Sequence, residues 1–502
     1  MSKFSTEFFS THIANDNKNT LGIYNDLVLA YKTSVLSYPA EKNILGVYFI
    51  DILKLLTQSF FKKKELELGI EPSHKYVNRS LEAWPYIGYD DIRDGCDIKL
   101  KRFGRGSSIT QSNLKSLLQF AVNTQYFFGR NPSIKLSVVT PRIDNGSNLL
   151  WRQTPDIMTN LVNVKSGWFS VPQLGDQLEL LKNLVVEIME KNHHPISPKL
   201  ITSLLENHIK ADCSEGELNV QFKGDILLLS SGVEIQNRML AIAAIQQGLP
   251  VVNIMHGEAY GVCDEPIFSE FGEQMYSSAI LGYGDRVLSA QDTYKFGMKD
   301  HVKYIKSNGV NALRHYKPEF SGIGHNPTKV NYFYYPTTMS GATHRYGPYR
   351  DTADSLYLLW QKSLFSVFGD LIKIKTHPKE KYKMSFSFSE TKIVSGSFDD
   401  LLDEIDVFVF DYIGTAFNEA CATSKPIIYF DLGIRNINSE ALISIKERTI
   451  YFDIKDGMPT LKEIQEHLIF GKKENMYTDK YSLCGGNKSR AKSLSEGIKE
   501  LK

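Results

Sequence analysis

Residues 406–415 of the chain read Asp-Val-Phe-Val-Phe-Asp-Tyr-Ile-Gly-Thr, and they are the clearest indication of its fold class. The apolar residues after Asp406 are typical of a strand that is buried on both faces of a parallel sheet. Gly414 and Thr415 stand just before a predicted helix over residues 417–423. A buried strand that leads through a short turn into a helix predicts a doubly wound α/β domain.

The same alternation of short apolar strands and helices extends over the C-terminal half. It predicts strands at residues 330–335, 371–375, 393–394 and 426–430, and helices at 352–368, 399–404 and 461–469. An earlier series predicts strands at residues 133–140, 225–229 and 251–255, and helices at 113–128, 175–210 and 234–247. We therefore expect an α/β protein of two doubly wound, Rossmann-like domains that face a cleft, with helical additions in the N-terminal half.

A stretch with Gly, Pro and Asn near residues 307–328 separates the two series. It divides the chain into an N-terminal domain of residues 1–310 and a C-terminal domain of residues 311–480. In doubly wound sheets, ligands bind outside the carboxyl ends of the strands. The residues that follow the predicted strands are therefore the candidates for the functional site.

The composition excludes several classes of protein. The chain has 502 residues, 42% of them hydrophobic and 23% charged, and a formal net charge of +1, which argues against dedicated nucleic-acid binding. Its five cysteines form no CxxC pair, so we expect a reducing cytosol and neither a disulfide framework nor a structural zinc site. No run of about 18 apolar residues and no signal-peptide core occurs, which predicts a cytoplasmic protein.

One segment leaves a membrane role open. The basic run at residues 62–64 follows an apolar, aromatic stretch at residues 52–61. A buried helix with a solvated end is the favoured interpretation. The alternative is peripheral contact with an anionic membrane, at its inner face.

The strand at residues 251–255 is followed by His256-Gly257-Glu258. His256 and Glu258 are the candidate catalytic residues, since a histidine at a strand end facing the cleft serves as a general base or donates to a phosphate oxygen. A structural histidine packed under a turn is the alternative. Ser231 and Glu234 follow the preceding strand, and they either line the acceptor side or serve helix packing.

The strand at residues 371–375 is followed by Thr376-His377-Pro378-Lys379. Proline biases His377 toward an extended conformation, and Lys375 and Lys379 add positive charge beside it. This cluster suits a phosphate, with a solvated edge loop as the alternative. The loop after residue 335 contains further anion-binding donors, namely Ser340, His344 and Arg345.

The strand at residues 406–410 ends in Asp411, and the helix after it carries Glu419. Gly414 and Thr415 at the helix N-terminus present backbone N–H groups and a hydroxyl to an anion, unless Thr415 simply caps the helix. Asp411 holds either the loop or a ligand hydroxyl. Glu419 is placed to accept ribose hydroxyls.

Together these motifs resemble a GT-B glycosyltransferase over about residues 224–435. The likeness is strongest to bacterial surface-polysaccharide transferases, in two branches. The sialyltransferase and Kdo-transferase group holds the phosphate of a CMP-sugar with a His-Pro motif and a downstream Ser or Thr, here His377-Pro378 and Thr415. The teichoic-acid glycerophosphotransferase group has a similar His-Gly turn, a His-Pro with basic neighbours and an Asp-Tyr-Ser-Ser stretch, here residues 411–415. The resemblance also implies that a C-terminal helix within residues 481–502 packs back on the N-terminal domain.

The resemblance implies an enzyme that moves a sugar from a nucleotide donor to a glycan or lipid-linked acceptor. The favoured donor is a CMP-activated acidic sugar such as Kdo or a nonulosonic acid, and no metal or further cofactor is expected. The resemblance then assigns three groups of residues. The phosphate and nucleotide are bound by His377, Pro378, Lys379, Gly414, Thr415 and Glu419, with Ser395 and Ser397 near the nucleoside. The donor sugar is faced by Ser340, His344, Arg345 and Asp411. The alternatives are a polyol phosphotransferase that uses CDP-glycerol or CDP-ribitol, and a non-catalytic nucleotide- or sugar-binding protein.

Overall fold

The structure is a computed structural model that describes part of the chain. The described residues are 23, 26, 27, 29, 30, 134–138, 157–161, 163–164, 175–193, 199, 220–222, 224–229, 235–255, 261–263, 274–285, 302–309, 315–317, 330–337, 354–376, 393–433, 437–470, 476–483 and 490–501. The predicted helix at residues 113–128 and the basic run at residues 62–64 lie outside them.

The C-terminal half forms a sheet of six parallel strands in the order β11-β10-β9-β12-β13-β14. Numbered along the chain, this is the order 3-2-1-4-5-6 of the Rossmann fold, and the direction of winding reverses between β9 and β12. The strands are β9 (Tyr332–Tyr335), β10 (Ile372–Lys375), β11 (Ile393–Val394), β12 (Val407–Phe410), β13 (Ile427–Asp431) and β14 (Ile450–Asp453).

Strand β12 illustrates why these segments are apolar throughout. Successive side chains of a strand point to opposite faces of the sheet. Val407 and Val409 belong to the core on one face, whereas Phe408 and Phe410 belong to the core on the other. All four side chains are buried, so the sheet is covered on both faces as the sequence predicts.

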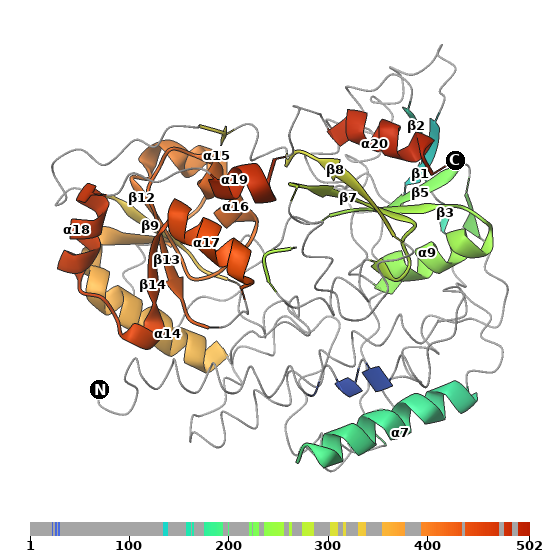
Figure 1. Cartoon of the computed structure of the whole chain (residues 1–502), viewed down its shortest axis with the longest axis horizontal. Coiled ribbons are helices and arrows are strands. Elements are labelled where there is room, and N and C mark those ends of the chain that lie inside the picture. Colours follow the sequence, from blue (N-terminus) through green and yellow to red (C-terminus); the bar gives the residue numbers. More distant parts are fainter. Residues whose placement is uncertain are drawn as a thin grey trace.

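Helices cover both faces of this sheet (Figure 1). On one face lie α14 (Asp354–Phe368) and α18 (Leu461–Phe470). On the other lie α15 (Phe398–Leu401), α16 (Thr415–Ala422), α17 (Ser439–Arg448) and α19 (Met476–Tyr481). Because α14 connects β9 to β10 and α16 connects β12 to β13, the two helices beside the reversal cover opposite faces of the sheet.

The N-terminal half contains a second sheet of six parallel strands, in the order β2-β1-β5-β6-β7-β8. The strands are β1 (Ile134–Val138), β2 (Ile157–Leu161), β5 (Ile226–Leu229), β6 (Val251–Ile254), β7 (Ala279–Tyr283) and β8 (Lys303–Ser307). Helix α9 (Ile235–Gln246) connects β5 to β6. A short antiparallel pair, β3 (Asn163–Val164) and β4 (Val220–Gln221), lies apart from this sheet.

The predicted fold class, two doubly wound α/β units with parallel sheets, is therefore confirmed. Helix α7 (Gly175–Lys191) is one of the helical additions expected in the N-terminal half. The boundaries at residues 310 and 480 and the cleft between the units stay predictions. Among the described residues, no helix is both long enough and apolar enough to cross a membrane.

The last helix of the described chain, α20 (Arg490–Lys499), packs against the N-terminal sheet beside β8 (Figure 1). Leu494 and Ile498 are fully buried in the same core as Ile305 of β8. Gly497 also faces Ile305, and a Cβ atom at position 497 would lie 2.5 Å from Ile305 Cδ1. The chain therefore returns to its first sheet after completing the second.

Segments of the two halves are also in direct contact at the carboxyl ends of β6 to β8. The Asn438 side chain donates to the carbonyls of Gly261 at 2.8 Å and Val262 at 2.9 Å. The Gly309 N–H donates to the carbonyl of Ser482 at 2.8 Å. Gly284 has φ +84°, and a Cβ there would lie 2.5 Å from the Tyr481 carbonyl carbon, so both its backbone conformation and its close neighbour require glycine.

Candidate functional site at the strand reversal

The reversal between β9 and β12 marks the candidate site. In doubly wound sheets, the loops after the two strands at such a reversal run in opposite directions, and ligands bind between them outside the carboxyl ends of the strands. Tyr335 at the end of β9 pairs in register with Phe410 at the end of β12. Pro336 and Thr337 therefore lie beside Asp411, where the turn into α16 begins.

The N-terminus of α16 faces this position. Gly414 is its N-cap residue, with φ −149° and ψ −167°, and it makes no side-chain capping hydrogen bond. The first turn of α16 carries no acidic residue, and Thr415 is exposed. The N-terminal end of a helix presents backbone N–H groups and a partial positive charge, so this end favours an anion.

Asp411 is buried beneath the turn, with 3% of its surface exposed. Its Oδ2 atom accepts hydrogen bonds from Tyr334 Oη at 2.5 Å and from Trp360 Nε1 at 2.7 Å. Tyr357 Oη lies 3.0 Å from each carboxylate oxygen. The carboxylate therefore has internal partners on both oxygens, from β9 and from α14.

Tyr357 extends this network to the loop after β9. Its hydroxyl oxygen accepts a hydrogen bond from the Thr337 backbone N–H at 3.1 Å. It also lies 2.9 Å from Tyr334 Oη, which in turn accepts from Gln361 Nε2 at 3.3 Å. One helix, α14, thus supplies Tyr357, Trp360 and Gln361, and connects the two loops that flank the reversal.

Burial sets the ionisation of this network. It raises the pKa of Asp411 to about 6, while the hydrogen bonds from Tyr334, Trp360 and Tyr357 act in the opposite direction. Burial, reinforced by the charge of Asp411, also raises the pKa of Tyr334 and of Tyr357. Both phenols therefore remain neutral hydrogen-bond donors over the physiological range of pH.

On the other face of β9, Tyr335 lies close to Glu419 of α16. Tyr335 is 8% exposed and stacks on Phe410 with a ring-centroid distance of 5.4 Å. Burial raises the pKa of Tyr335, and the charge of Glu419 raises it further. Tyr335 Oη and Thr337 Oγ1 are buried and have no hydrogen-bond partner within the part of the chain that the structure describes.

Glu419 and its neighbour Asn418 are turned into the protein. Glu419 is 9% exposed. Asn418 is 7% exposed, and its Oδ1 accepts from Tyr477 Oη of α19 at 2.9 Å. The expected contact of Glu419 with ribose hydroxyls stays a prediction.

The two serines predicted near the nucleoside follow β11 and are exposed. Ser397 forms a capping box with Asp400: its backbone N–H donates to Asp400 Oδ2 at 2.9 Å, and its Oγ accepts from the Asp400 N–H at 3.2 Å. This contact explains Ser397 by helix capping. Ser395 precedes the cap and makes no contact that decides its role.

At the end of β10, Lys375 Nζ donates to the Thr376 carbonyl at 2.9 Å, and burial lowers the pKa of its ammonium group. Lys375 is the last described basic residue before the predicted phosphate cluster.

Many of the predicted site residues lie outside the described residues, so their placement stays a prediction. The members of this set are Ser231, Glu234, His256, Glu258, Ser340, His344, Arg345, His377, Pro378 and Lys379. By chain position they follow β5, β6, β9 and β10.

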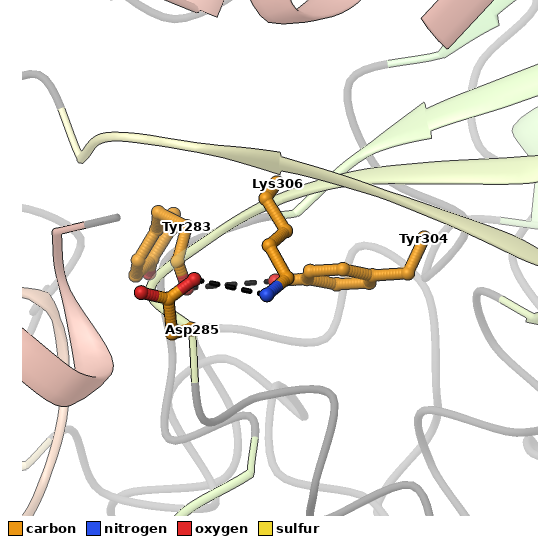
Figure 2. Close-up of polar contacts among 4 residues, drawn as sticks. All are labelled: Tyr283, Asp285, Tyr304 and Lys306. Atoms are coloured by element: carbon orange, nitrogen blue, oxygen red, sulfur yellow. Dashed lines mark hydrogen bonds and ion pairs between the residues drawn. The ribbon is translucent and has the colours of Figure 1, made fainter. Parts of the chain in front are cut away.

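Two polar contacts connect β7 and β8 near the carboxyl edge of the N-terminal sheet (Figure 2). Lys306 Nζ pairs with Asp285 Oδ1 at 3.0 Å, and Tyr304 Oη lies 3.5 Å from the Tyr283 carbonyl. The Tyr304 ring also crosses Gly282 so closely that no side chain would fit at that position. These contacts fix the edge that faces Tyr481 of the C-terminal half.

Sequence reasoning missed the aromatic partners of Asp411. One signal was present, since Tyr334 lies in an apolar strand and the hydroxyl of a buried tyrosine usually finds a hydrogen-bond partner. Metal ligands form no such group: in the described part of the chain, His, Cys, Asp and Glu side chains make no cluster of three that would hold a metal ion.

No protein-family model and no curated protein matches this sequence. Among solved structures, the chain is similar to the glycotransferase of kitacinnamycin, with 11% identity, 74% of this chain and 95% of that chain covered, and a TM-score of 0.33. It is also similar to a protein assigned as a UDP-N-acetylglucosamine 2-epimerase from Listeria monocytogenes, with 12% identity, coverage of 74% and 97%, and a TM-score of 0.40. The glycosyltransferase SnogD from Streptomyces nogalater matches with 10% identity, coverage of 74% and 100%, and a TM-score of 0.33. These are distant likenesses, and the fold of this chain rests on its own two parallel sheets.

Proposed function

We propose that this chain is a glycosyltransferase that binds a nucleotide-activated sugar at the carboxyl edge of its C-terminal sheet. The observation that carries the proposal is the strand reversal between β9 and β12, where the uncapped N-terminus of α16 meets the end of β9. This is the position at which doubly wound sheets bind nucleotides, and a helix N-terminus there favours a phosphate.

The donor that we favour is a CMP-activated acidic sugar such as Kdo or a nonulosonic acid. This choice rests on the sequence motifs His377-Pro378 and Thr415, which would hold the single phosphate between them, with Lys379 nearby. Ser340, His344 and Arg345 would face the carboxylate of the sugar, since a guanidinium forms paired hydrogen bonds with such a group. Glu419 would accept the ribose hydroxyls.

The acceptor would be a surface glycan or a lipid-linked glycan, bound on the side of the N-terminal sheet. His256 or Glu258, which follow β6, would take the proton from the attacking hydroxyl. As the bond between the sugar and the phosphate breaks, negative charge develops on the departing CMP. The α16 N-terminus and the basic residues after β10 would stabilise this charge, which is the main expected contribution to the rate.

A thermal-shift panel of CMP, CDP, UDP, UMP, GDP and dTDP tests the binding step. A ligand that binds only the folded protein stabilises it, by about 2.7 kcal/mol at a concentration of 100 Kd. We expect CMP to raise the melting temperature most. A panel in which no nucleotide raises it would contradict the proposal.

Product analysis separates the transferase from the polyol phosphotransferase of the same fold. Both reactions release CMP, so the acceptor product must be examined. A product that gains a sugar and no phosphorus supports the proposal. A product that gains phosphorus from CDP-glycerol or CDP-ribitol assigns the chain to the alternative.

A further inference from the structure

The hydroxyl of Tyr357 makes two different hydrogen bonds at the strand reversal. Its proton is directed to Asp411, whose two oxygens each lie 3.0 Å away. Its oxygen accepts the backbone N–H of Thr337 at 3.1 Å. A phenol has one proton and can accept through its lone pairs, so both bonds form at the same time.

Asp411 is held in place by more than Tyr357. Tyr334 from β9 and Trp360 from α14 donate to its Oδ2 atom at 2.5 and 2.7 Å. Three donors converge on one buried carboxyl group, which fixes its orientation and that of the residue that begins the turn into α16. Tyr334 and Tyr357 thus share a partner, but of the two only Tyr357 hydrogen-bonds to the loop after β9.

We propose that Tyr357 and Asp411 are positioning residues that hold the Thr337 backbone at a set distance from the α16 N-terminus. The proposal rests on the proposed function in that it takes the space between these two loops as the donor site. Neither side chain needs to touch the donor. They act through Thr337, from which the chain continues to Ser340, His344 and Arg345, and through the turn that carries Gly414.

The strand topology explains why the Tyr357 bridge between Asp411 and Thr337 would be needed. Loops that leave neighbouring strands in opposite directions share no backbone hydrogen bonds of the sheet beyond the last pair, here Tyr335 and Phe410. A side-chain bridge is therefore needed to fix one loop against the other. A binding site whose two sides are preorganised loses less entropy when the ligand binds.

The test compares Tyr357→Phe with Tyr334→Phe. Both substitutions remove one phenol oxygen from a fully buried ring and one hydrogen bond to Asp411. Only Tyr357→Phe also leaves the Thr337 N–H without its acceptor. Tyr334→Phe instead leaves Gln361 Nε2 without its acceptor, so similar losses of stability are expected. Differences between the two variants in other measurements therefore report on the bridge to Thr337.

Two measurements are made on the full chain. Amide hydrogen exchange of the free protein should be at least tenfold faster at Thr337 in Tyr357→Phe and unchanged there in Tyr334→Phe. The Kd for the nucleotide that gives the largest thermal shift should rise about fivefold to twentyfold in Tyr357→Phe and less than twofold in Tyr334→Phe. Asp411→Asn, whose amide nitrogen cannot accept from Tyr357, serves as a second variant and should also speed exchange at Thr337.

The outcomes separate this proposal from the proposed function. Unchanged exchange at Thr337 in Tyr357→Phe, or equal changes in exchange and Kd in both tyrosine variants, would overturn the positioning role. Faster exchange with an unchanged Kd would also overturn it, since the bridge would then not serve the site. If the wild-type protein binds no nucleotide, the proposed function fails, and the assignment of the bridge to a donor site fails with it, although the exchange result still decides whether the bridge holds Thr337.

Discussion

Tyr357 Oη lies 3.0 Å from the carboxylate of Asp411, although the two residues belong to a helix and a turn that are 54 positions apart. The contact places α14, which carries Tyr357, beside the turn that leads into α16. The ionisation of Asp411, the packing of α16 and the proposed nucleotide site meet at this turn, and each can be tested separately.

The buried carboxyl of Asp411 makes stability depend on pH. Its pKa is raised from 3.8 to about 6 in the folded protein, so between these values the folded state holds a proton that the unfolded state has released. The contribution of this group to stability is present below pH 4 and is lost as the pH rises through 6. Its full size is on the order of 3 kcal/mol.

Asp411→Asn cannot titrate, so the difference in unfolding free energy between wild type and variant should be larger at pH 4.5 than at pH 7.5. Chemical denaturation at a series of pH values measures it. A difference that stays constant from pH 4 to pH 8 would contradict a raised pKa for Asp411.

Arg448 should be indispensable to the packing of α16. It is 1% exposed and donates to the carbonyls of Cys421 at 2.9 Å, Thr423 at 2.8 Å and Lys425 at 3.0 Å, at and beyond the C-terminal end of that helix. Lysine cannot reproduce this fork of donors. Arg448→Lys should therefore lower the free energy of unfolding by about 2–4 kcal/mol. Glu447→Gln, on the exposed side of the same helix, is the control and should change it by less than about 0.5 kcal/mol.

The close contact of Gly497 with Ile305 predicts a specific coupling between α20 and β8. Gly497→Ala places a methyl group within 2.5 Å of Ile305 Cδ1 and should destabilise the protein by about 1–3 kcal/mol. Ile305→Ala removes the atoms that clash, so the double variant should be more stable than the sum of the two single effects predicts. Strict additivity in urea unfolding would show that α20 does not pack on β8.

Replacing the proposed base tests the acceptor side. One of the two variants His256→Ala and Glu258→Gln removes the proposed general base. That variant should lower kcat by about 10²–10⁴ and leave the affinity for CMP unchanged. If neither variant lowers kcat, the base lies elsewhere.

The sequence predicted much of the C-terminal sheet, because its strands are short, apolar runs that end in turns. Residues 407–410 and 427–431 were recognised within a residue of their observed ends. Strand β14 of this sheet and strands β2, β7 and β8 of the N-terminal sheet were missed. β8 reads Lys-Tyr-Ile-Lys-Ser and alternates weakly, and β7 contains Gly282, which interrupts its pattern.

The order of the strands and the partners of Asp411 were beyond sequence reasoning. Strand order depends on which neighbours pair in three dimensions, and a run of apolar residues carries no information about it. Tyr357 and Trp360 read as ordinary members of an amphipathic helix. Only their distances of 3.0 and 2.7 Å to Asp411 identify them as its partners.

A matched pair of variants at Gly414 tests the nucleotide site most directly. Asp and Asn have nearly the same shape and are both good N-cap residues, and the extended backbone of Gly414 accepts either with a small shift of the Tyr412 ring. They differ by one negative charge at the end of α16, where the phosphate would bind. Both side chains cap the helix and compete with a phosphate for its first N–H groups, so isothermal titration with CMP should give both variants a higher Kd than wild type. The Kd of Gly414→Asp should be at least about tenfold higher than that of Gly414→Asn. Equal affinities in the two variants would contradict a phosphate site at the N-terminus of α16.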